Sequence, residues 1–320
     1  MKIVFMGTPD FAVPTLKNLV DSKHEVVGVV TQPDRPKGRG RELAPPPVKQ
    51  LALQENLTLF QPENASDPSF VETLRKLTPD LIIVVAYGQI LKPPVLEIPR
   101  MFCINLHASI LPKYRGAAPI NWAIINGETE TGVTTMKMDQ GLDTGDILLI
   151  RKIEIKPDDD SQTLENSLAE IGASLVLETI DRLKENTILP IPQDSSQSTY
   201  APKMKKEHGL IQWEKEAAQI ANLVRGVVPW PGAYSFLKSK RLRIRRVETT
   251  PSESGEQPGT ILRLTDRGIE VGTTRGRIII TELQPEGKNK MSAKSFLLGH
   301  HVDKGDRFTS TLTLEPSNAS

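Results

Sequence analysis

Apolar and amphipathic segments alternate through the first half of the chain. Five short apolar runs have the length of buried strands and recur at the spacing of a parallel sheet, namely 3–6, 26–31, 57–60, 81–86 and 103–106. The segments between them place apolar residues on one helical face, as Val13, Leu16 and Val20 do. Strand–helix repeats of this kind predict a doubly wound, Rossmann-like α/β layer. The layer is completed by two more strands, at 132–138 and 147–155, and by a long helix around 164–175.

The second half has a different pattern. Residues 188–206 are rich in Pro, Ser and Gln, which is typical of a linker. One helix pattern follows at 217–224, and then come five short strands between Gly/Pro turns, at 234–237, 242–247, 259–265, 268–272 and 277–283. We therefore predict a catalytic domain at 1–187, a linker at 188–206, a small antiparallel β-barrel of OB type at 207–308, and a disordered tail at 309–320.

Length and composition agree with two ordinary domains in a chain of 320 residues. No apolar run approaches the roughly 20 residues that span a membrane. The apolar stretch at the start is too short for a secretion signal, and we expect a cytoplasmic protein without membrane contact. Cys103 is the single cysteine, which excludes an internal disulfide and a multi-cysteine zinc site. We expect a buried thiol and no bound metal.

Charge is distributed unevenly along the chain. Residues 203–320 hold 20 Lys/Arg and 13 Asp/Glu, a net charge of +7, whereas residues 1–202 hold 20 and 26, a net charge of −6. The positive second half suggests a polyanionic partner.

The turn after the first strand argues against a nucleotide cofactor. Its sequence Gly7-Thr8-Pro9-Asp10 has one glycine where a dinucleotide-binding protein carries G-x-G-x-x-G. A nicotinamide-dependent dehydrogenase is disfavoured for this reason. The chain also lacks the G-x-x-x-x-G-K-[ST] motif of ATP-binding loops.

Candidate chemistry lies at the end of the strand at 103–106. Asn105 and His107 are two residues apart, so on a strand they share a face. In an open α/β sheet, ligands bind beyond the carboxyl ends of the strands. An amide there can donate to an oxyanion, and an imidazole can move protons near neutral pH. Taken alone, the pair is also typical of an asparagine that caps a turn and a polar histidine at a strand end.

A glycine-flanked loop at 141–146 supplies candidate carboxylates. A carboxylate close to His107 would fix the tautomer of the imidazole and favour its protonated form. Asp139, Asp143 and Asp146 are all available, and their spacing does not choose among them. A plain hairpin turn is the alternative interpretation.

The Asn-x-His-x-Ser-x-Leu-Pro tract at 105–112, with the Asp-x-Gly-x-Asp-x-Gly loop at 139–145, resembles the folate-dependent formyltransferase family. The resemblance implies that Asn105, His107 and Asp143 act on the formyl group of 10-formyltetrahydrofolate, a co-substrate used without a metal. Ile110 stands where leucine is more usual in the family. The donor is then expected to lie between two backbone segments, made of Tyr87 and Gly88 and of Ser109, Ile110, Leu111 and Pro112.

Three more tracts indicate the acceptor. The basic loop at 31–41 and the tracts at 229–233 and 283–291 resemble the family members that formylate methionyl initiator tRNA, which starts translation. That likeness extends from Met1 to about residue 305. It implies RNA contacts from the loop cations, Arg35, Lys37, Arg39 and Arg41. We expect the enzyme to be a monomer.

A cationic strand supports this acceptor independently of the resemblance. Arg241, Arg243 and Arg245 alternate with apolar residues, which places three guanidinium groups on one face of a strand. Residues 238–246 hold six cations in nine positions, as expected of a phosphate-binding stripe. Nearby lysines, Lys203, Lys205 and Lys206, would extend it. A solvated barrel face is the alternative.

Two other functions compete with this one. A formyltransferase acting on a sugar nucleotide would explain the tract at 105–112 but not the basic strand. A non-catalytic RNA-binding protein would explain the basic strand but leave Asn105, His107 and Asp143 without a purpose.

Overall fold

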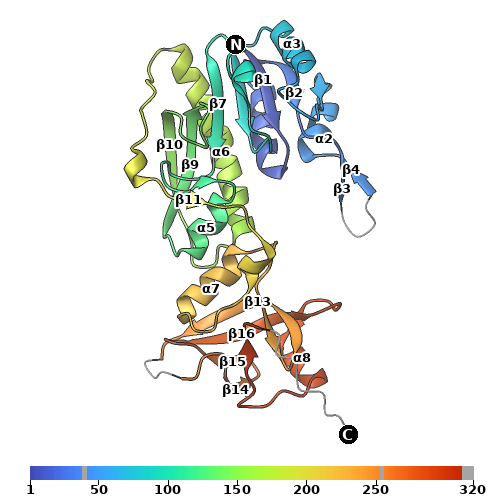
Figure 1. Cartoon of the computed structure of the whole chain (residues 1–320), viewed down its shortest axis with the longest axis vertical. Coiled ribbons are helices and arrows are strands. Elements are labelled where there is room, and N and C mark those ends of the chain that lie inside the picture. Colours follow the sequence, from blue (N-terminus) through green and yellow to red (C-terminus); the bar gives the residue numbers. More distant parts are fainter. Residues whose placement is uncertain (38–41, 253–255, 312–320) are drawn as a thin grey trace. The chain divides into compact units, whose positions relative to one another are not determined.

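A computed structural model describes residues 1–37, 42–252 and 256–311, which divide into two units (Figure 1). Unit 1 comprises residues 1–119, 130–154 and 164–201, and unit 2 comprises 120–129, 155–163 and the chain from 202 onward. The segment at 188–201, predicted as part of a linker, thus belongs to unit 1. Unit 2 includes two segments from the first half of the chain. They belong to it because Asn121 in one and Ser161 in the other both donate to the backbone carbonyl of Gly226.

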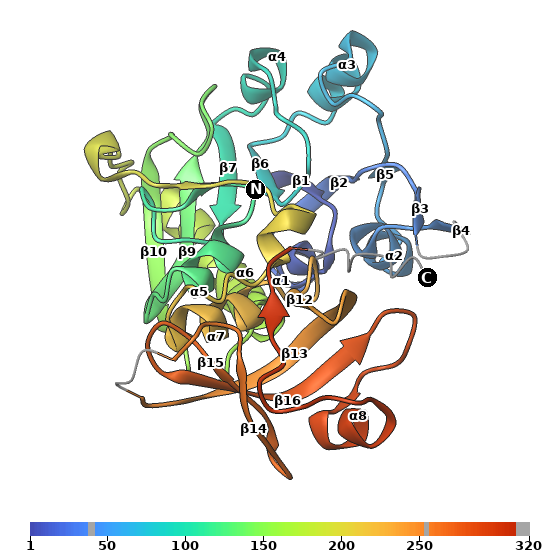
Figure 2. The same cartoon turned by 60° about the horizontal axis from the view of Figure 1, so that its bottom comes forward.

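Unit 1 is built on a seven-stranded sheet with the order β10-β9-β7-β6-β1-β2-β5 (Figure 2). Its strands are β1 (Lys2–Gly7), β2 (Glu25–Val30), β5 (Leu59–Phe60), β6 (Leu81–Val85), β7 (Phe102–His107), β9 (Glu130–Lys137) and β10 (Ile147–Glu154). The first five in chain order are parallel, and β9 and β10 are antiparallel. The prediction of a doubly wound sheet is confirmed.

The helices of unit 1 are α1 (Val13–Val20), α2 (Pro47–Gln54), α3 (Pro68–Lys76), α4 (Pro93–Leu96) and most of α6 (Ser161–Lys184), whereas α5 (Pro119–Ile125) falls in unit 2 apart from its first residue. Residues of α3 and α4 share a core cluster with Val4, Ile82 and Cys103. The α6 helix packs on the other face, where a Cβ at Gly172 would lie 2.6 Å from Leu106. Successive side chains of a strand alternate between faces, so Asn105 and His107 share the face of Cys103. Burial raises the pKa of the Cys103 thiol to about 12, as expected for a structural cysteine.

Unit 2 holds an antiparallel sheet with the order β14-β15-β16-β13-β12-β18, and β17 pairs with β16. Its elements are α7 (Ala217–Gly226), β12 (Tyr234–Leu237), β13 (Lys240–Thr250), β14 (Ile261–Thr265), β15 (Gly268–Gly272), β16 (Arg277–Pro285), β17 (Met291–Ser292), α8 (Ala293–Gly299) and β18 (Phe308–Thr309). The two ends of the sheet meet, because Thr260 bridges to Arg307 and Phe308 donates to Gly259. This curled sheet confirms the predicted barrel-like second domain.

Several short elements had no signal in the hydrophobic pattern. A hairpin of β3 (Arg35–Lys37) and β4 (Glu42–Ala44) flanks the basic loop. Within the predicted linker, β11 (Tyr200–Ala201) pairs in parallel with β8 (Arg115–Gly116). Thr309, predicted to begin a disordered tail, instead pairs with Phe236 in β18. Residues 312–320 lie outside the described part of the chain.

No helix in the described ranges is both long enough and apolar enough to cross a membrane.

A buried histidine in unit 1 links stability to pH. His24 is 8% exposed, and its Nδ1 has no hydrogen-bond partner among the described residues. Burial is the main cause that lowers the pKa of His24 below 6.5, with a contribution from the positive N-terminus. Asp181, whose Oδ1 lies 3.7 Å from Nε2, opposes this shift. Because the folded pKa is the lower one, acid favours the unfolded state.

We expect His24→Gln to reduce the loss of stability on acidification. The free energy of unfolding of the wild-type protein should fall as pH drops below about 6.5, where the unfolded imidazole binds a proton. Urea-unfolding midpoints at pH 7.5 and 5.5, followed by circular dichroism, measure the difference. An equal decline in both proteins would contradict the role of His24.

Candidate active site

The site begins at the end of β7, a buried strand between β6 and β9. Asn105 pairs in register with Val84 on one side and Met136 on the other. The side chain of Asn105 is half-buried, and its amide has no hydrogen-bond partner among the described residues. An amide held at the carboxyl edge of the sheet with its N–H groups uncommitted can donate to a ligand oxygen.

Both ring nitrogens of His107 face protein groups. Nε2 lies 2.9 Å from the backbone carbonyl oxygen of Tyr114. A carbonyl oxygen can only accept, so Nε2 carries a proton and donates it. Nδ1 lies 3.7 Å from Oδ2 of Asp143, which is within ion-pair range but beyond a hydrogen bond. Among the described residues, Nδ1 is therefore the ring nitrogen without a hydrogen-bond partner, and it is the one that faces Asp143.

Among the three candidate acids, Asp143 is the one that faces His107. Its Oδ2 also accepts a hydrogen bond from the backbone N–H of Gly116 at 2.8 Å. Asp139 instead closes the loop on itself, accepting from Gly141 N and from Thr144 Oγ1. The backbone of Asp143 has a φ of 54°, a left-handed conformation that aspartate tolerates better than most residues.

The turn that follows β7 is held by hydroxyl groups. Ser109 Oγ donates to the carbonyl of Lys113 at 2.6 Å. The buried Thr134 Oγ1 donates to the carbonyl of Ser109 at 2.6 Å and accepts from Leu111 N at 3.2 Å. These contacts satisfy polar backbone groups that a buried turn would otherwise leave unpaired. Ile110 and Pro112 are half-buried beside them.

The end of β6 lies next to the end of β1. Thr8 Oγ1 donates to the carbonyl of Tyr87 at 2.8 Å. The Tyr87 ring is 2% exposed, and burial raises the pKa of its hydroxyl to about 12. Gly88 is exposed and has a φ of 92°, which a residue with a side chain rarely adopts. The strand order reverses between β1 and β6, and ligands of open α/β sheets bind at such a point.

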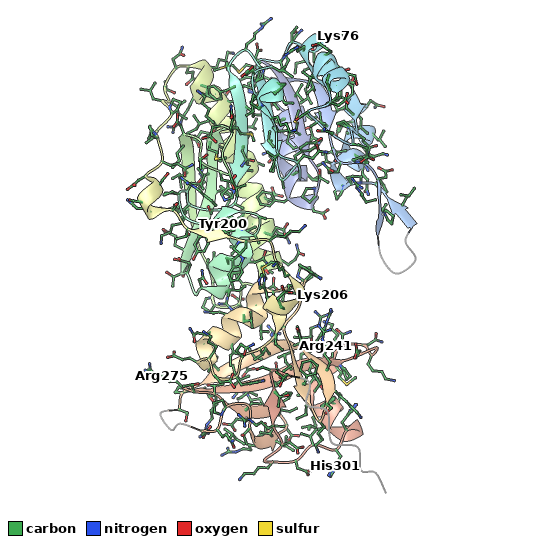
Figure 3. The ribbon with its side chains drawn as sticks, viewed as in Figure 1. Lys76, Tyr200, Lys206, Arg241, Arg275 and His301 are labelled. Atoms are coloured by element: carbon green, nitrogen blue, oxygen red, sulfur yellow. The ribbon has the colours of Figure 1, made fainter. Side chains whose placement is uncertain are left out.

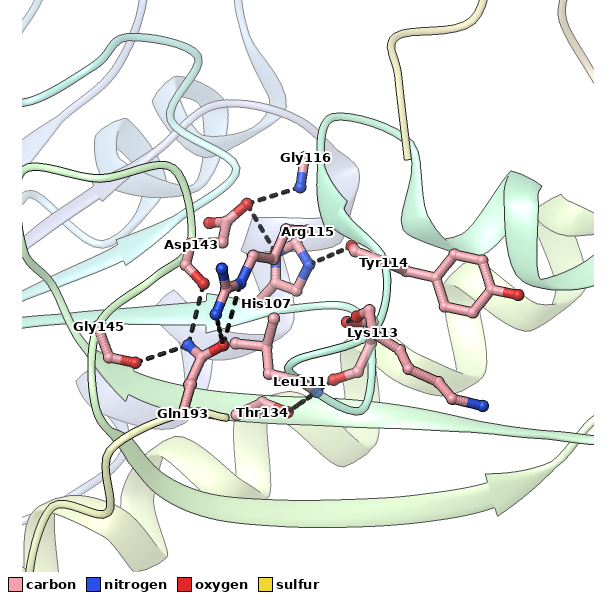
Figure 4. A network of polar contacts seen from close by, with 11 residues as sticks. His107, Leu111, Lys113, Tyr114, Arg115, Gly116, Thr134, Asp143, Gly145 and Gln193 are labelled. Atoms are coloured by element: carbon pink, nitrogen blue, oxygen red, sulfur yellow. Dashed lines mark hydrogen bonds and ion pairs between the residues drawn. The ribbon is translucent and has the colours of Figure 1, made fainter. Parts of the chain in front are cut away.

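Figure 4 shows groups around the His107–Asp143 pair that the sequence did not single out. Besides the backbones of Tyr114 and Gly116, these are the side chains of Arg115 and Gln193. Tyr114, Arg115 and Gly116 continue the tract at 105–112, so proximity in sequence was a signal for them. Gln193 lies in the predicted linker, where composition gave no signal.

The basic hairpin is only partly described. Arg35 lies in β3 and contacts Glu63, 3.3 Å away, in an exposed ion pair. Lys37 pairs in backbone register with Glu42. Arg39 and Arg41 lie outside the described residues.

The arginines of β13 form a group in unit 2. Leu242 and Ile244 are buried, at 3% and 1% exposure, whereas Arg241, Arg243 and Arg245 are half-exposed. None of the three guanidinium groups has an ion-pair partner in the described part of the chain. The Nε atoms of Arg241 and Arg245 are buried and also lack a hydrogen-bond partner there.

Two further contacts define this group. The Arg241 guanidinium lies 4.0 Å from the ring centroid of Tyr234, a cation–π contact. Burial, followed by the positive charges of Arg245 and Arg241, lowers the pKa of Arg243. Like charges held together, with no acid paired to them in the described part of the chain, can bind a polyanion. We call Arg241, Arg243 and Arg245 the arginine group.

The lysines predicted to extend the arginine group are exposed. Lys203, Lys205 and Lys206 are all exposed, and Lys206 is labelled in Figure 3. Their segment leads to Gly209, where a Cβ would lie 2.3 Å from the carbonyl of Gly232. A Cβ at Gly232 would in turn lie 3.8 Å from the Arg243 side chain, so Gly209, three residues after Lys206, is linked to the arginine group through Gly232.

Within the described ranges, no group of three or more His, Cys, Asp or Glu side chains is arranged to hold a metal ion.

Comparison with known families defines the class of this protein. Residues 1–180 match the formyl transferase family, and residues 203–301 match the formyl transferase C-terminal domain. The chain belongs to the formyl transferase family.

Individual relatives show which group within the formyl transferase family the chain is most like. A methionyl-tRNA formyltransferase of Geobacter sulfurreducens is 52% identical over 307 residues, covering 96% of each chain. That of Citrifermentans bemidjiense is 54% identical over 305 residues, covering 95% of each chain. Within its family, the chain therefore belongs with the methionyl-tRNA formyltransferases.

Solved structures share the fold at lower identity. One is an N-formyltransferase from Helicobacter canadensis in complex with folinic acid and dTDP-3-aminofucose. It is 20% identical, with a TM-score of 0.67, and the match covers 88% of this chain and 99% of that one.

We expect Thr134→Val to destabilise the turn that follows β7. Valine has nearly the same shape, but it leaves the Ser109 carbonyl and the Leu111 N–H without their partner. An unpaired buried polar group costs about 1–3 kcal/mol, and the free energy of unfolding in urea should fall by about that amount. Thr134→Ser keeps the hydroxyl and should lose much less. Equal losses in the two variants would show that packing, and not hydrogen bonding, holds the turn.

Proposed function

We propose that this enzyme transfers the formyl group of 10-formyltetrahydrofolate to the α-amino group of methionyl initiator tRNA, forming formylmethionyl-tRNA for translation initiation. The observation that supports the proposal most is the match to methionyl-tRNA formyltransferases through both units of the chain. Such an enzyme works in the cytoplasm, and we propose that it acts there as a monomer.

The donor is placed at the carboxyl edge of the unit 1 sheet. The exposed Gly88 peptide and the half-buried Ile110 and Pro112 are the parts of the predicted folate segments that can meet it directly. Tyr87, Ser109 and Leu111 act indirectly. The carbonyls of Tyr87 and Ser109 and the N–H of Leu111 are already bonded to Thr8 or Thr134. They hold the segments that contact the pterin.

The reaction begins when the neutral amine of methionine attacks the formyl carbon. A C–N bond forms, and the carbonyl electrons move to oxygen. Asn105 donates from its uncommitted amide to this oxyanion, an interaction that grows as charge develops. Tyr114 holds the His107 ring through Nε2, so the N–H at that atom is not available to the oxyanion.

The intermediate collapses when the bond from the formyl carbon to N10 of folate breaks. The amine must lose one proton, and N10 must gain one. The Asp143 carboxylate and Nδ1 of His107, 3.7 Å apart, form the place where this proton is held in transit. Water carries it over the remaining gap.

The acceptor is bound through its phosphates. The arginine group of β13 and Lys203, Lys205 and Lys206 position the RNA, while Arg35, Lys37, Arg39 and Arg41 of the basic loop at 31–41 contact the acceptor stem. Contacts of this kind fix register and orientation without reading bases.

Transfer of labelled formyl from 10-formyltetrahydrofolate to charged initiator tRNA tests this function. Label is expected on methionyl-tRNA and not on uncharged tRNA. Label on a dTDP-amino sugar instead would show that the acceptor is a sugar nucleotide, and only the proposed formyl transfer would be supported. Absence of label on either acceptor would reject the proposal.

We expect Asn105→Ala to lower kcat about 10²–10³-fold, the usual effect of losing one oxyanion donor. KM for both substrates should change little, because the interaction forms only in the transition state. Steady-state kinetics with each substrate varied in turn give both parameters. A raised KM with an intact kcat would instead make Asn105 a residue that binds the ground state.

The arginine group can be tested through the salt dependence of RNA binding. Each of Arg241→Ala, Arg243→Ala and Arg245→Ala should weaken binding to tRNA and reduce the slope of log K against log salt by roughly 0.7–0.9. Arg267→Ala is the matched control, since Arg267 is already paired with Glu248. The same slope in the control and in the three variants would refute phosphate contacts by the arginine group.

A further inference from the structure

Gln193 lies in the segment between α6 and β11, outside any helix or strand of the structure. Its side-chain amide is nevertheless fully engaged. Nε2 donates to the carbonyl of Asp143 at 2.9 Å and to the carbonyl of Gly145 at 2.6 Å. Oε1 accepts from Arg115, at 3.1 Å from Nε and 2.7 Å from Nη2. All the polar positions that an amide offers are thus used.

The two segments that Gln193 joins are those that hold His107 and Asp143 (Figure 4). Arg115 stands between Tyr114, whose carbonyl fixes His107, and Gly116, whose N–H fixes the Asp143 carboxylate. On the other side, Gln193 holds the backbone of Asp143 itself.

These segments need external support. Tyr114 has a φ of 59° and Asp143 a φ of 54°, left-handed conformations that persist when surrounding contacts determine them. Thr199 adds a second tie from the same side, because its Oγ1 accepts from Tyr114 N at 2.8 Å and its carbonyl accepts from Arg115 N. Gln193 and Thr199 thus form a brace along the His107–Asp143 pair.

We infer that Gln193 is a positioning residue of the formyl-transfer reaction: it sets the separation between His107 and Asp143 by fixing the two chain segments that carry their partners. The inference rests on the proposed function for its kinetic consequence, but its structural content does not. Gln193 touches neither ring nor carboxylate, so it acts through Arg115 and the 143–145 backbone.

The first test needs no substrate. Gln193→Met keeps the length of the side chain and removes its hydrogen bonds. Gln197→Met is the matched control because, among the described residues, the Gln197 side chain bonds only to the exposed Asp194. The ring nitrogens of His107 are observed by NMR in ¹⁵N-histidine protein and assigned by their loss in His107→Asn. Gln193→Met is expected to shift the Nδ1 signal, and Gln197→Met to leave it in place. An unchanged His107 spectrum in Gln193→Met would overturn the inference, whatever the activity.

The second test is kinetic. Gln193→Met should lower kcat about ten- to a hundred-fold, as small misplacements of catalytic groups do, with KM for both substrates retained. In an Asp143→Asn background the same substitution should lower kcat less than about two-fold, because residues that act as one unit are not additive. Equal losses in both backgrounds, or a rise in KM alone, would contradict positioning through Asp143.

Gln193→Glu separates the two halves of the brace. A carboxylate can still accept from Arg115 but cannot donate to the carbonyls of Asp143 and Gly145. Its kcat should therefore be as low as that of Gln193→Met, and wild-type activity in this variant would refute the link to the 143–145 loop. If wild-type protein formylates no tRNA while the NMR shift is observed, the proposed acceptor fails and the positioning role stands.

Discussion

The hydrogen bond from His107 Nε2 to the carbonyl of Tyr114 is the contact on which the arrangement of the candidate active site depends. It fixes the tautomer and the plane of the imidazole, so Nδ1 has to face Asp143. The bond forms because β7 ends at His107 and the chain returns seven residues later with Tyr114 in a left-handed conformation. Asn105, two residues earlier on the same face, is left with an uncommitted amide. The proposed roles, Asn105 as the oxyanion donor and the His107–Asp143 pair as the proton site, follow from this arrangement.

Loops built this close to a sheet edge need partners for their own backbone. Thr134 provides them for the turn after β7, and Gln193 for the Asp143 loop. Each uses one side chain to satisfy two backbone groups of the loop it holds. Such neutral contacts are individually modest, but losing one leaves buried polar atoms unpaired. The precision of the site therefore depends on residues that never meet a substrate.

In unit 2, by contrast, the charged groups of the arginine group are left without ion-pair partners among the described residues. The arginine group keeps three cations close together without an acid partner in the described part of the chain. Their mutual repulsion is tolerated because the stems pack on a curled sheet and one guanidinium rests on Tyr234. A phosphate backbone would relieve this repulsion, which supports the proposal that the arginine group binds RNA phosphates.

The sequence by itself determined the order of strands and helices, the barrel-like second half and the candidates Asn105 and His107, because hydrophobic periodicity and the position of polar residues at strand ends are local signals. Only the tertiary structure decided which of three aspartates faces His107, and that Arg115 and Gln193 support the pair. The pairings of β8, β11 and β18 were also decided only by the tertiary structure, because these short strands have no hydrophobic pattern in the sequence. Contacts between residues some fifty to eighty positions apart depend on how the chain returns to the sheet edge, and no periodicity in the sequence records that path.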